Sequence, residues 1–321
     1  PARPRARLPH PPLESGVVKP LLAAAVILSP LWNDQFSLFT LSQAAMNPDN
    51  SFLFANVPPG RYRIQARGET ERGGVTRFSV FTISLDGGDR LNADMTLSQG
   101  AVVSGVVEWD TTTGRPPVAT SDIVVRMPME DGNDFGDAIT GYLQPGDMWR
   151  INGVMAGRHY VRVDGLPPGW YLKRVEYRGA DITDVPTNFK YDQVVPDFKI
   201  VLSNRSTVVR GFVTPRGRDD MQSYAVVAFS TSPLLWTSQS RYTQLTYPDA
   251  LGRYEFRGLP PGNYVVAATR GVDFSDLSDP RVFDALLRRE GVSSPFNLRE
   301  SQVWRQDVVP LLRTRSSDGG H

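Results

Sequence analysis

The sequence contains no cysteine and only three histidines among its 321 residues. The absence of cysteine excludes disulfide bonds, thiolate nucleophiles and metal sites that are held by cysteine. His10 and His321 lie near the ends of the sequence, which leaves His159 as the interior histidine. A histidine-centred metal or acid–base site has few residues to draw on, so the sequence predicts a protein that is not an enzyme and has no cofactor and no metal.

An excess of charge of one sign is also lacking. Lysine and arginine total 35 residues against 34 for aspartate and glutamate, so no overall field attracts nucleic acid or an anionic membrane. Residues 1–12 form an arm rich in proline and arginine, and we expect the sequence to begin after processing or within a longer precursor. Its arginines are candidates for contact with an anionic partner, although arginines among prolines more often belong to a solvated linker. They are Arg3, Arg5 and Arg7.

A long hydrophobic run is missing as well. The apolar stretch 17–32 is interrupted by Lys19, Pro20 and Pro30, and it is shorter than the roughly 20 residues of a membrane-spanning helix. It fits either a signal or membrane anchor or a pair of β-strands. The strands are favoured, because the same pattern recurs downstream.

Glycine and proline, by contrast, are abundant, with 28 and 26 residues. One arrangement of them occurs three times, at residues 51–66, 148–163 and 253–268. Each copy has an alternating apolar–polar stretch, a Pro-Pro-Gly or Met-Ala-Gly turn and a second alternating stretch. Alternation with a period of two predicts strands with one buried face. The strand aromatics expected to point inward are Phe52, Phe54, Tyr254 and Phe256.

The turn in each copy is predicted to be a structural corner. Proline fixes φ near −65°, and glycine accepts the positive φ that closes a type II turn. An aromatic residue two positions after the glycine is typical of a tyrosine corner, and we interpret His159 as a replacement for that tyrosine rather than as a ligand. The predicted corner pairs are Gly60 with Tyr62, Gly157 with His159, Gly262 with Tyr264, and Gly169 with Tyr171 in a fourth Pro-Pro-Gly turn.

Further strands complete each copy. A strand around a glycine is expected before each corner, at residues 15–18, 104–107 and 210–213, with closing strands at 92–97, 197–202 and 306–312. Asp279-Pro280 followed by Val282, Phe283, Leu286 and Leu287 predicts one short helix in the third copy. The predicted division is an arm (1–12), three β-sandwich domains (13–99, 100–203 and 204–313) joined by short linkers, and a tail (314–321).

These residues carry a resemblance to a known family. The string Gly-x-Phe-x-Phe-x-x-Leu-Pro-Pro-Gly-x-Tyr-x-Val-x-Ala, preceded by a Val-x-Gly-x-Val strand, resembles the carboxypeptidase-regulatory-like domains, and the likeness covers residues 13–313. It implies an all-β fold of three tandem Ig-like or prealbumin-like antiparallel sandwiches with about seven strands each. Residues 165–173 and 179–186 are similar to tandem members in large exported bacterial proteins. Such domains are accessory modules, so the resemblance implies no active site and a periplasmic or extracellular location.

Two acidic groups could hold a cation. Residues 131–137 place oxygen ligands close together, although no glutamate completes a calcium loop, and an acidic surface loop is favoured over a metal site. The weak metal candidates in it are Asp131, Asn133, Asp134 and Asp137. Asp273 and Asp276 form a second group with Asp279, which is explained as a helix-start residue.

Aromatic side chains could bind sugar rings by stacking. Trp149 is expected to be packed in a core, whereas Trp236, Tyr242 and Tyr247 lie in or near a Ser/Thr-rich loop and are candidates for a ligand or partner. The leading hypothesis is a scaffold or protein-interaction subunit of an exported or membrane-associated assembly, which uses strand edges and loops for contacts. The alternative is an array of carbohydrate-binding modules at the cell surface. Membrane contact is expected only through a partner or an anchor.

Overall fold

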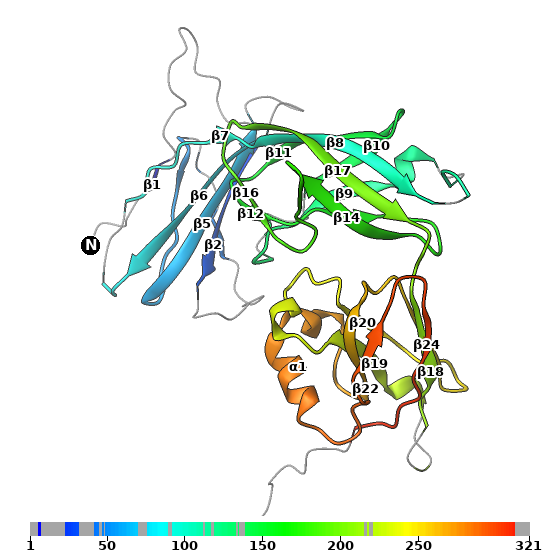
Figure 1. The fold of residues 1–321 in the computed structure, drawn as a ribbon. Coiled ribbons are helices and arrows are strands. Elements are labelled where there is room, and N and C mark those ends of the chain that lie inside the picture. Colours follow the sequence, from blue (N-terminus) through cyan, green and yellow to red (C-terminus); the bar gives the residue numbers. More distant parts are fainter. Residues whose placement is uncertain are drawn as a thin grey trace, which may run out of the picture. The chain divides into compact units, whose positions relative to one another are not determined.

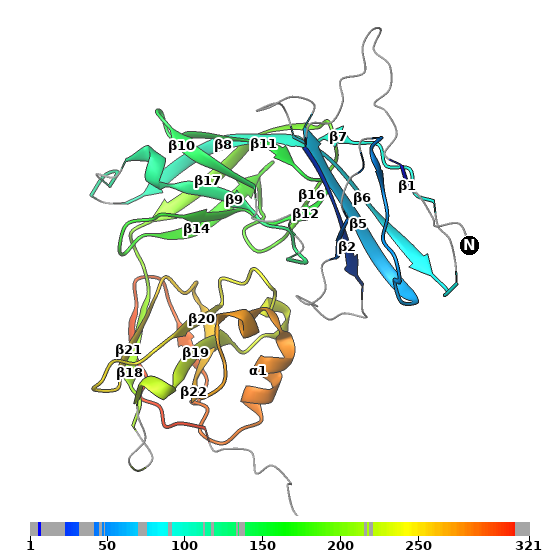
Figure 2. The ribbon, with the colours of Figure 1, turned by 180° about the vertical axis from the view of Figure 1, so that it is seen from behind.

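A computed structural model describes residues 6–7, 23–31, 42–44, 47, 49–69, 76–88, 92–111, 113–116, 119–132, 134, 139–214, 217 and 221–311. These residues are mainly β-strand with one α-helix, which confirms the predicted all-β class (Figures 1 and 2). They divide into two compact units, one of residues 1–107, 119–164 and 176–199, and one of residues 108–118, 165–175 and 200–321. The division into three consecutive domains stays a prediction.

The first copy has a five-stranded sheet in the order β3-β2-β5-β6-β7 and a small pair, β1-β4. Its central strands β5 and β6 pair antiparallel along ten residues each. Phe52, Tyr62 and Ile64 lie in its core, and Phe54 packs against that core while partly buried. The strands are β1 (Ala6–Arg7), β2 (Ala23–Pro30), β3 (Ser42–Ala44), β4 (Ser51–Phe52), β5 (Gly60–Glu69), β6 (Thr76–Leu85) and β7 (Ser98–Gln99).

The second copy has an eight-stranded sheet in the order β13-β9-β10-β11-β8-β17-β14-β15 and a pair, β12-β16. Trp149 is 1% exposed and contacts Phe198 edge-to-face, as the alternation of β11 predicts for a core residue. The strands are β8 (Ala101–Asp110), β9 (Val124–Met127), β10 (Ile139–Gln144), β11 (Met148–Val154), β12 (Gly157–His159), β13 (Arg162–Asp164), β14 (Tyr171–Tyr177), β15 (Ala180–Asp181), β16 (Thr187–Phe189) and β17 (Val194–Ser203).

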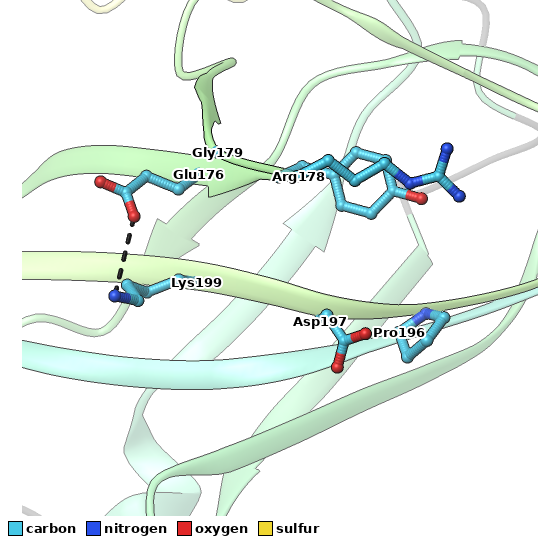
Figure 3. Close-up of a pocket in the computed structure, with 7 residues that line it drawn as sticks. Glu176, Arg178, Gly179, Pro196, Asp197 and Lys199 are labelled. Atoms are coloured by element: carbon cyan, nitrogen blue, oxygen red, sulfur yellow. Dashed lines mark ion pairs between the residues drawn. The ribbon is translucent and has the colours of Figure 1, made fainter.

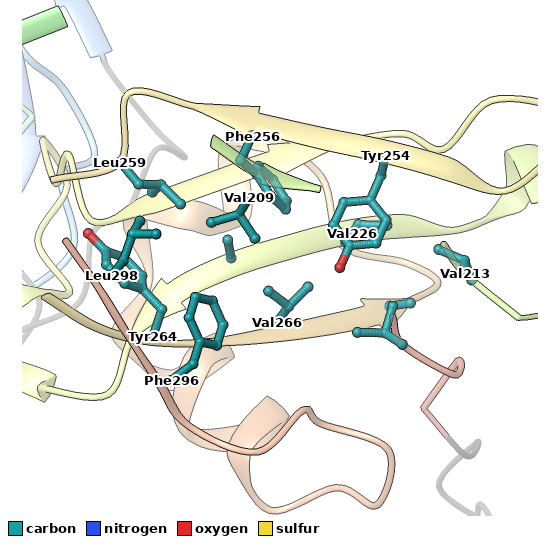
Figure 4. Packing of buried hydrophobic residues seen from close by; sticks show 13 residues of the cluster. Val209, Val213, Val226, Tyr254, Phe256, Leu259, Tyr264, Val266, Phe296 and Leu298 are labelled. Carbon is teal, nitrogen blue, oxygen red and sulfur yellow. The ribbon is translucent and has the colours of Figure 1, made fainter. Parts of the chain in front are cut away.

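The third copy has a three-stranded sheet, β21-β18-β24, and a four-stranded sheet, β20-β19-β22-β23. Figure 4 shows the core of this copy, in which Tyr254 and Phe256 of β21 and Tyr264 and Val266 of β22 are buried. The strands are β18 (Val208–Phe212), β19 (Ala225–Ser230), β20 (Thr243–Thr246), β21 (Arg253–Arg257), β22 (Gly262–Thr269), β23 (Phe296–Leu298) and β24 (Val303–Arg305).

The helix α1 (Pro280–Leu287) begins where the sequence predicts. The Asp279 side chain accepts a hydrogen bond from the Arg281 N–H and so caps it. Phe283 and Leu286 pack with Val227 and Phe229 of β19, on the opposite face of that strand from Val226 and Ala228. Strands β19 and β22 are consequently buried on both faces, so the third copy has a helix layer in addition to its two sheets.

Two predicted closing strands differ from the structure. Residues 92–97 form no strand, although Ala93, Met95 and Leu97 are buried in the first core, because they pack there without a hydrogen-bond ladder. Instead of a strand at 306–312, the structure has the shorter β24 just before that range and isolated bridges at Val308 and Pro310. The closing strand predicted for the second copy, at residues 197–202, is confirmed as part of β17. The expected strand at 15–18 lies outside the described residues.

Candidate functional site

Two of the predicted corners are closed by a tyrosine hydroxyl. The Tyr62 Oη donates to the carbonyl of Pro58 at 2.8 Å, and the Tyr264 Oη donates to the carbonyl of Pro260 at 2.7 Å. Both tyrosines are buried, and each acceptor lies four residues before its tyrosine. The ring therefore fills the core while its hydroxyl satisfies a turn carbonyl.

His159 occupies the same place in the second copy. Its Nε2 lies 3.0 Å from the carbonyl oxygen of Met155, again four residues earlier, and its Nδ1 lies 2.8 Å from the carbonyl oxygen of Met127. The side chain is 2% exposed, and burial lowers its pKa while the two carbonyls and Asp131 oppose that shift. The neutral ring has one N–H, so it donates to one of these two carbonyls and contacts the other, and it serves as a structural joint between the turn and the end of β9.

The fourth predicted corner is wrong in its bonding. The Tyr171 Oη donates to a carboxylate oxygen of Glu300 at 3.1 Å rather than to the carbonyl of Pro167.

The corner glycines also depart from the predicted type II turn, because φ is 155° at Gly60 and 135° at Gly157, and Gly262 has no positive φ. Only Gly169, with a φ of 85°, has the expected value.

Tyr171 belongs to a charged cluster that the sequence did not predict. The Lys173 Nζ lies 2.7 Å from carboxylate oxygens of both Asp110 and Glu300, and Arg205 pairs with the same two carboxylates at 2.7 and 3.6 Å. Hydrogen bonds from Lys173 and Arg205 lower the pKa of Asp110 to about 2. The residues come from distant parts of the sequence, so no local pattern could have revealed the cluster.

The Lys173 amine lies between the carboxylates of Asp110 and Glu300, and an amine and a carboxyl group are the two components of an amide bond. Condensation requires a neutral amine and a protonated carboxyl, whereas the hydrogen bonds from Lys173 lower the pKa of Glu300 and the two carboxylates raise the pKa of Lys173, although burial opposes both shifts. Asp110, Lys173, Arg205 and Glu300 therefore stay charged at neutral pH, and the cluster acts as an ion-pair network.

A pocket of about 420 Å³ lies between the end of β14 and β17 (Figure 3). Glu176 and Lys199 form an ion pair across it at 3.7 Å. The ring of Tyr177 stacks on Phe198 with centroids 4.4 Å apart, and the guanidinium of Arg178 lies 5.0 Å from the Tyr177 centroid. The remaining lining residues are Gly179, Pro196 and Asp197. The Arg178-Gly179 turn was visible in the sequence, but nothing there placed Asp197 opposite it.

The acidic loop is used for packing contacts. Asp131 pairs with Arg63 at 2.5 Å, and Asp134 accepts a hydrogen bond from the backbone N–H of Met129. Burial raises the pKa of Asp134 to about 6, and its carboxylate is already engaged by that backbone N–H. Among the described residues no group of three or more acidic or histidine side chains could hold a metal ion. Asn133 and Asp137 lie outside the described residues.

The proposed stacking role of Trp236 is wrong. Its side chain is 6% exposed, packs on Phe229 and Phe283, and donates from Nε1 to the carbonyl of Ser230. Helix α1 covers the loop and so buries the ring. Tyr242 stacks on Tyr264, whereas Tyr247 is 51% exposed and contacts Phe274 edge-to-face.

The candidate residues of the arm are not placed. Arg3 and Arg5 lie outside the described residues, and only the backbone of Arg7 is described, in β1 opposite Ser51. In the part of the chain that the structure describes, no helix is long and apolar enough to cross a membrane.

No protein-family model matches the chain, and no curated protein matches its sequence. Among solved structures, it is similar to the Bacillus anthracis TIE protein with 11% identity and a TM-score of 0.22, over 92% of this chain and 49% of that one. It is also similar to a minor pilin of Streptococcus agalactiae with 16% identity and a TM-score of 0.29, over 61% of this chain and 90% of that one. The major pilin subunit of Bacillus cereus matches with 10% identity and a TM-score of 0.23, over 96% and 99%. At these TM-scores the fold assignment rests on the sheets described above.

Proposed function

We propose that the chain is a non-catalytic structural subunit of an exported or membrane-associated assembly, and that it contacts protein partners through a strand edge. The observation that carries this proposal is the outer edge of β6. Strand β5 pairs with β6 from Thr76 to Leu85, but β7 pairs only with Arg77 and Phe78. Along Ser79–Leu85 the outer side of β6 has no strand neighbour among the described residues.

The composition of this edge favours pairing with another chain. Residues 79–85 contain no charge, no proline and no glycine, and Thr82 and Ser84 are exposed. Unpaired backbone N–H and C=O groups in an uncharged, β-branched segment are a template for strand addition.

The edge strand β21 of the third copy shows what a protected edge looks like. The backbone N–H and C=O of Arg253 bond within the turn to Asp249, and the Gln244 side chain donates to the carbonyl of Arg257. Its exposed side chains are also charged, with Arg257 paired to Glu255. Charge and capped backbone groups hinder strand addition at β21. Residues 79–85 of β6 carry no charge, and among the described residues the contact made to their backbone outside the pairing with β5 is the one between Val80 and the Tyr191 side chain.

The ion-pair network supports the non-catalytic part of the proposal. Pairing within the network shifts the pKa values of Asp110, Lys173 and Glu300 so that their charged forms are favoured. This pairing joins segments around residues 110, 173, 205 and 300, which is a structural task. Secretion and surface exposure enter the proposal through the family resemblance.

The test compares two matched substitutions in the full chain. Thr82→Lys places a charge on the open edge and is expected to abolish assembly. Light scattering measures self-association, and cross-linking in cells measures assembly with partners. Thr140→Lys makes the same change at an exposed site on β10, whose backbone there already pairs with β9. Equal assembly by the two variants would contradict the role of the edge.

The location is tested separately. In intact cells of the organism that makes the chain, an external protease should degrade it, or it should appear in the periplasmic fraction. Retention in the cytoplasm would contradict an exported subunit, whatever the result at Thr82.

A further inference from the structure

The pocket beside β14 and β17 holds two residues in an unfavourable backbone conformation. Arg178 has a φ of 52° and Asp197 a φ of 70°, in the left-handed region that residues with a side chain seldom adopt. Both line the same pocket. At Arg178 this φ is what the two-residue turn Arg178-Gly179 between β14 and β15 requires, whereas Asp197 lies within β17, where no turn accounts for it.

These two residues also present unpaired charges. No carboxylate among the described residues pairs with the Arg178 guanidinium, and no donor among them binds the Asp197 carboxylate. Figure 3 shows Arg178, which follows the end of β14, and Asp197 on β17 at the end of the pocket away from the Glu176–Lys199 pair. One end of the pocket is therefore internally satisfied, and the other offers a free donor group and a free acceptor group.

The charge balance of the lining indicates the class of ligand. The pocket contains two carboxylates and two cationic groups, so an ionic ligand would meet attraction and repulsion in equal measure. A neutral molecule with neighbouring hydroxyls can accept hydrogen bonds from Arg178 and donate them to Asp197 without bringing in a charge. The volume of about 420 Å³ is within the range of small-ligand sites.

We propose that this pocket binds a neutral saccharide, with Asp197 and Arg178 as hydrogen-bonding residues for vicinal hydroxyls. Lys199 and Glu176 close the other end, and the Phe198-supported ring of Tyr177 forms part of the wall. The site is independent of the proposed assembly role, because strand β6 contributes nothing to its lining.

The test uses the full chain, titrated with neutral α-1,4- and β-1,4-linked hexose oligomers at concentrations up to about 10 mM and followed by calorimetry or NMR. Binding to at least one of them is expected, with little change in affinity between low and high salt. Failure of every neutral oligomer to bind would overturn the proposal. Stronger binding of a uronic acid oligomer, lost at high salt, would overturn it as well.

Substitution by glycine separates binding from folding. Asp197→Gly removes the carboxylate and also relieves the backbone, since glycine tolerates a φ of 70°, so the variant is expected to fold and to bind about tenfold or more weakly. Arg178→Gly should behave in the same way. The matched control is Asp192→Gly, an exposed aspartate with a φ of 57° that does not line the pocket, and its affinity should equal that of the parent. Unchanged affinity of Asp197→Gly, or equal losses in Asp197→Gly and Asp192→Gly, would overturn the proposal.

Discussion

The corners of the second and third copies solve one structural problem with different side chains. The single hydroxyl of Tyr264 donates to the carbonyl of Pro260, whereas the ring of His159 contacts the corresponding carbonyl of Met155 and also that of Met127. What the two corners share is the captured carbonyl, four residues before the aromatic side chain.

The difference lies in what each side chain adds to that capture. Tyrosine adds a large buried ring and stays neutral, while His159 adds a second backbone contact and a group whose pKa burial lowers. The second corner therefore holds its neighbouring loop more directly, at the cost of sensitivity to acid.

The largest effect is expected from truncating the tyrosine corner. Tyr264 is fully buried, so Tyr264→Ala should lower the free energy of unfolding by about 3–5 kcal/mol through the cavity it leaves. Tyr264→Phe keeps the ring and leaves the Pro260 carbonyl unsatisfied, which should cost about 1–2 kcal/mol. Denaturant unfolding measures both, and equal losses would show that the hydroxyl rather than the ring carries the corner.

The glycines of the two corners should differ next. Gly157 has a φ of 135°, and an added Cβ would lie 3.0 Å from the Met129 side chain, so Gly157→Ala should cost about 1–3 kcal/mol. At Gly262 the backbone is unstrained and the nearest atom would be 3.6 Å away. Gly262→Ala should therefore change stability by less than about 1 kcal/mol. Similar shifts of the melting temperature in the two variants would remove this distinction.

Acid should weaken the histidine corner in particular. Burial lowers the pKa of His159, so the unfolded chain binds more protons at that site, and stability should fall as the pH drops below about 6.5 and through the folded pKa. Asp134 has the opposite effect on stability. Burial raises its pKa to about 6, so its contribution to stability increases as the pH falls from about 6 to about 4. The pH dependence of unfolding is therefore compared between Asp134→Asn and the double variant with His159→Gln. An identical pH dependence in the two would contradict the assignment.

The smallest effect is expected at Tyr171, which has the corner sequence without the corner bond. Its hydroxyl donates to Glu300, whose side chain is 31% exposed, so water can replace it there. Tyr171→Phe should cost less than about 1 kcal/mol, below the loss in Tyr264→Phe. A larger loss, measured by denaturant unfolding, would show that Tyr171 acts as a corner by another route.

The repeats made much of the fold predictable. Alternation placed Trp149, Tyr254 and Phe256 in cores, and Asp279-Pro280 placed the start of α1. The prediction failed where burial depends on a layer that is distant in sequence. The polar loop around Trp236 predicts an exposed ring, although helix α1 buries it. The alternation of apolar side chains at residues 92–97 predicts a strand, although these residues form no ladder bonds.

The sequence by itself determined the strand alternation and the positions of the corner residues, since both follow from side-chain periodicity and from the backbone limits of glycine and proline. Tertiary structure alone decided that Lys173 meets Asp110 and Glu300, that Arg178 and Asp197 line one pocket, and that the outer edge of β6 lacks a strand neighbour among the described residues. Contacts between residues this far apart depend on how strands are ordered and how they bend, which local patterns do not encode.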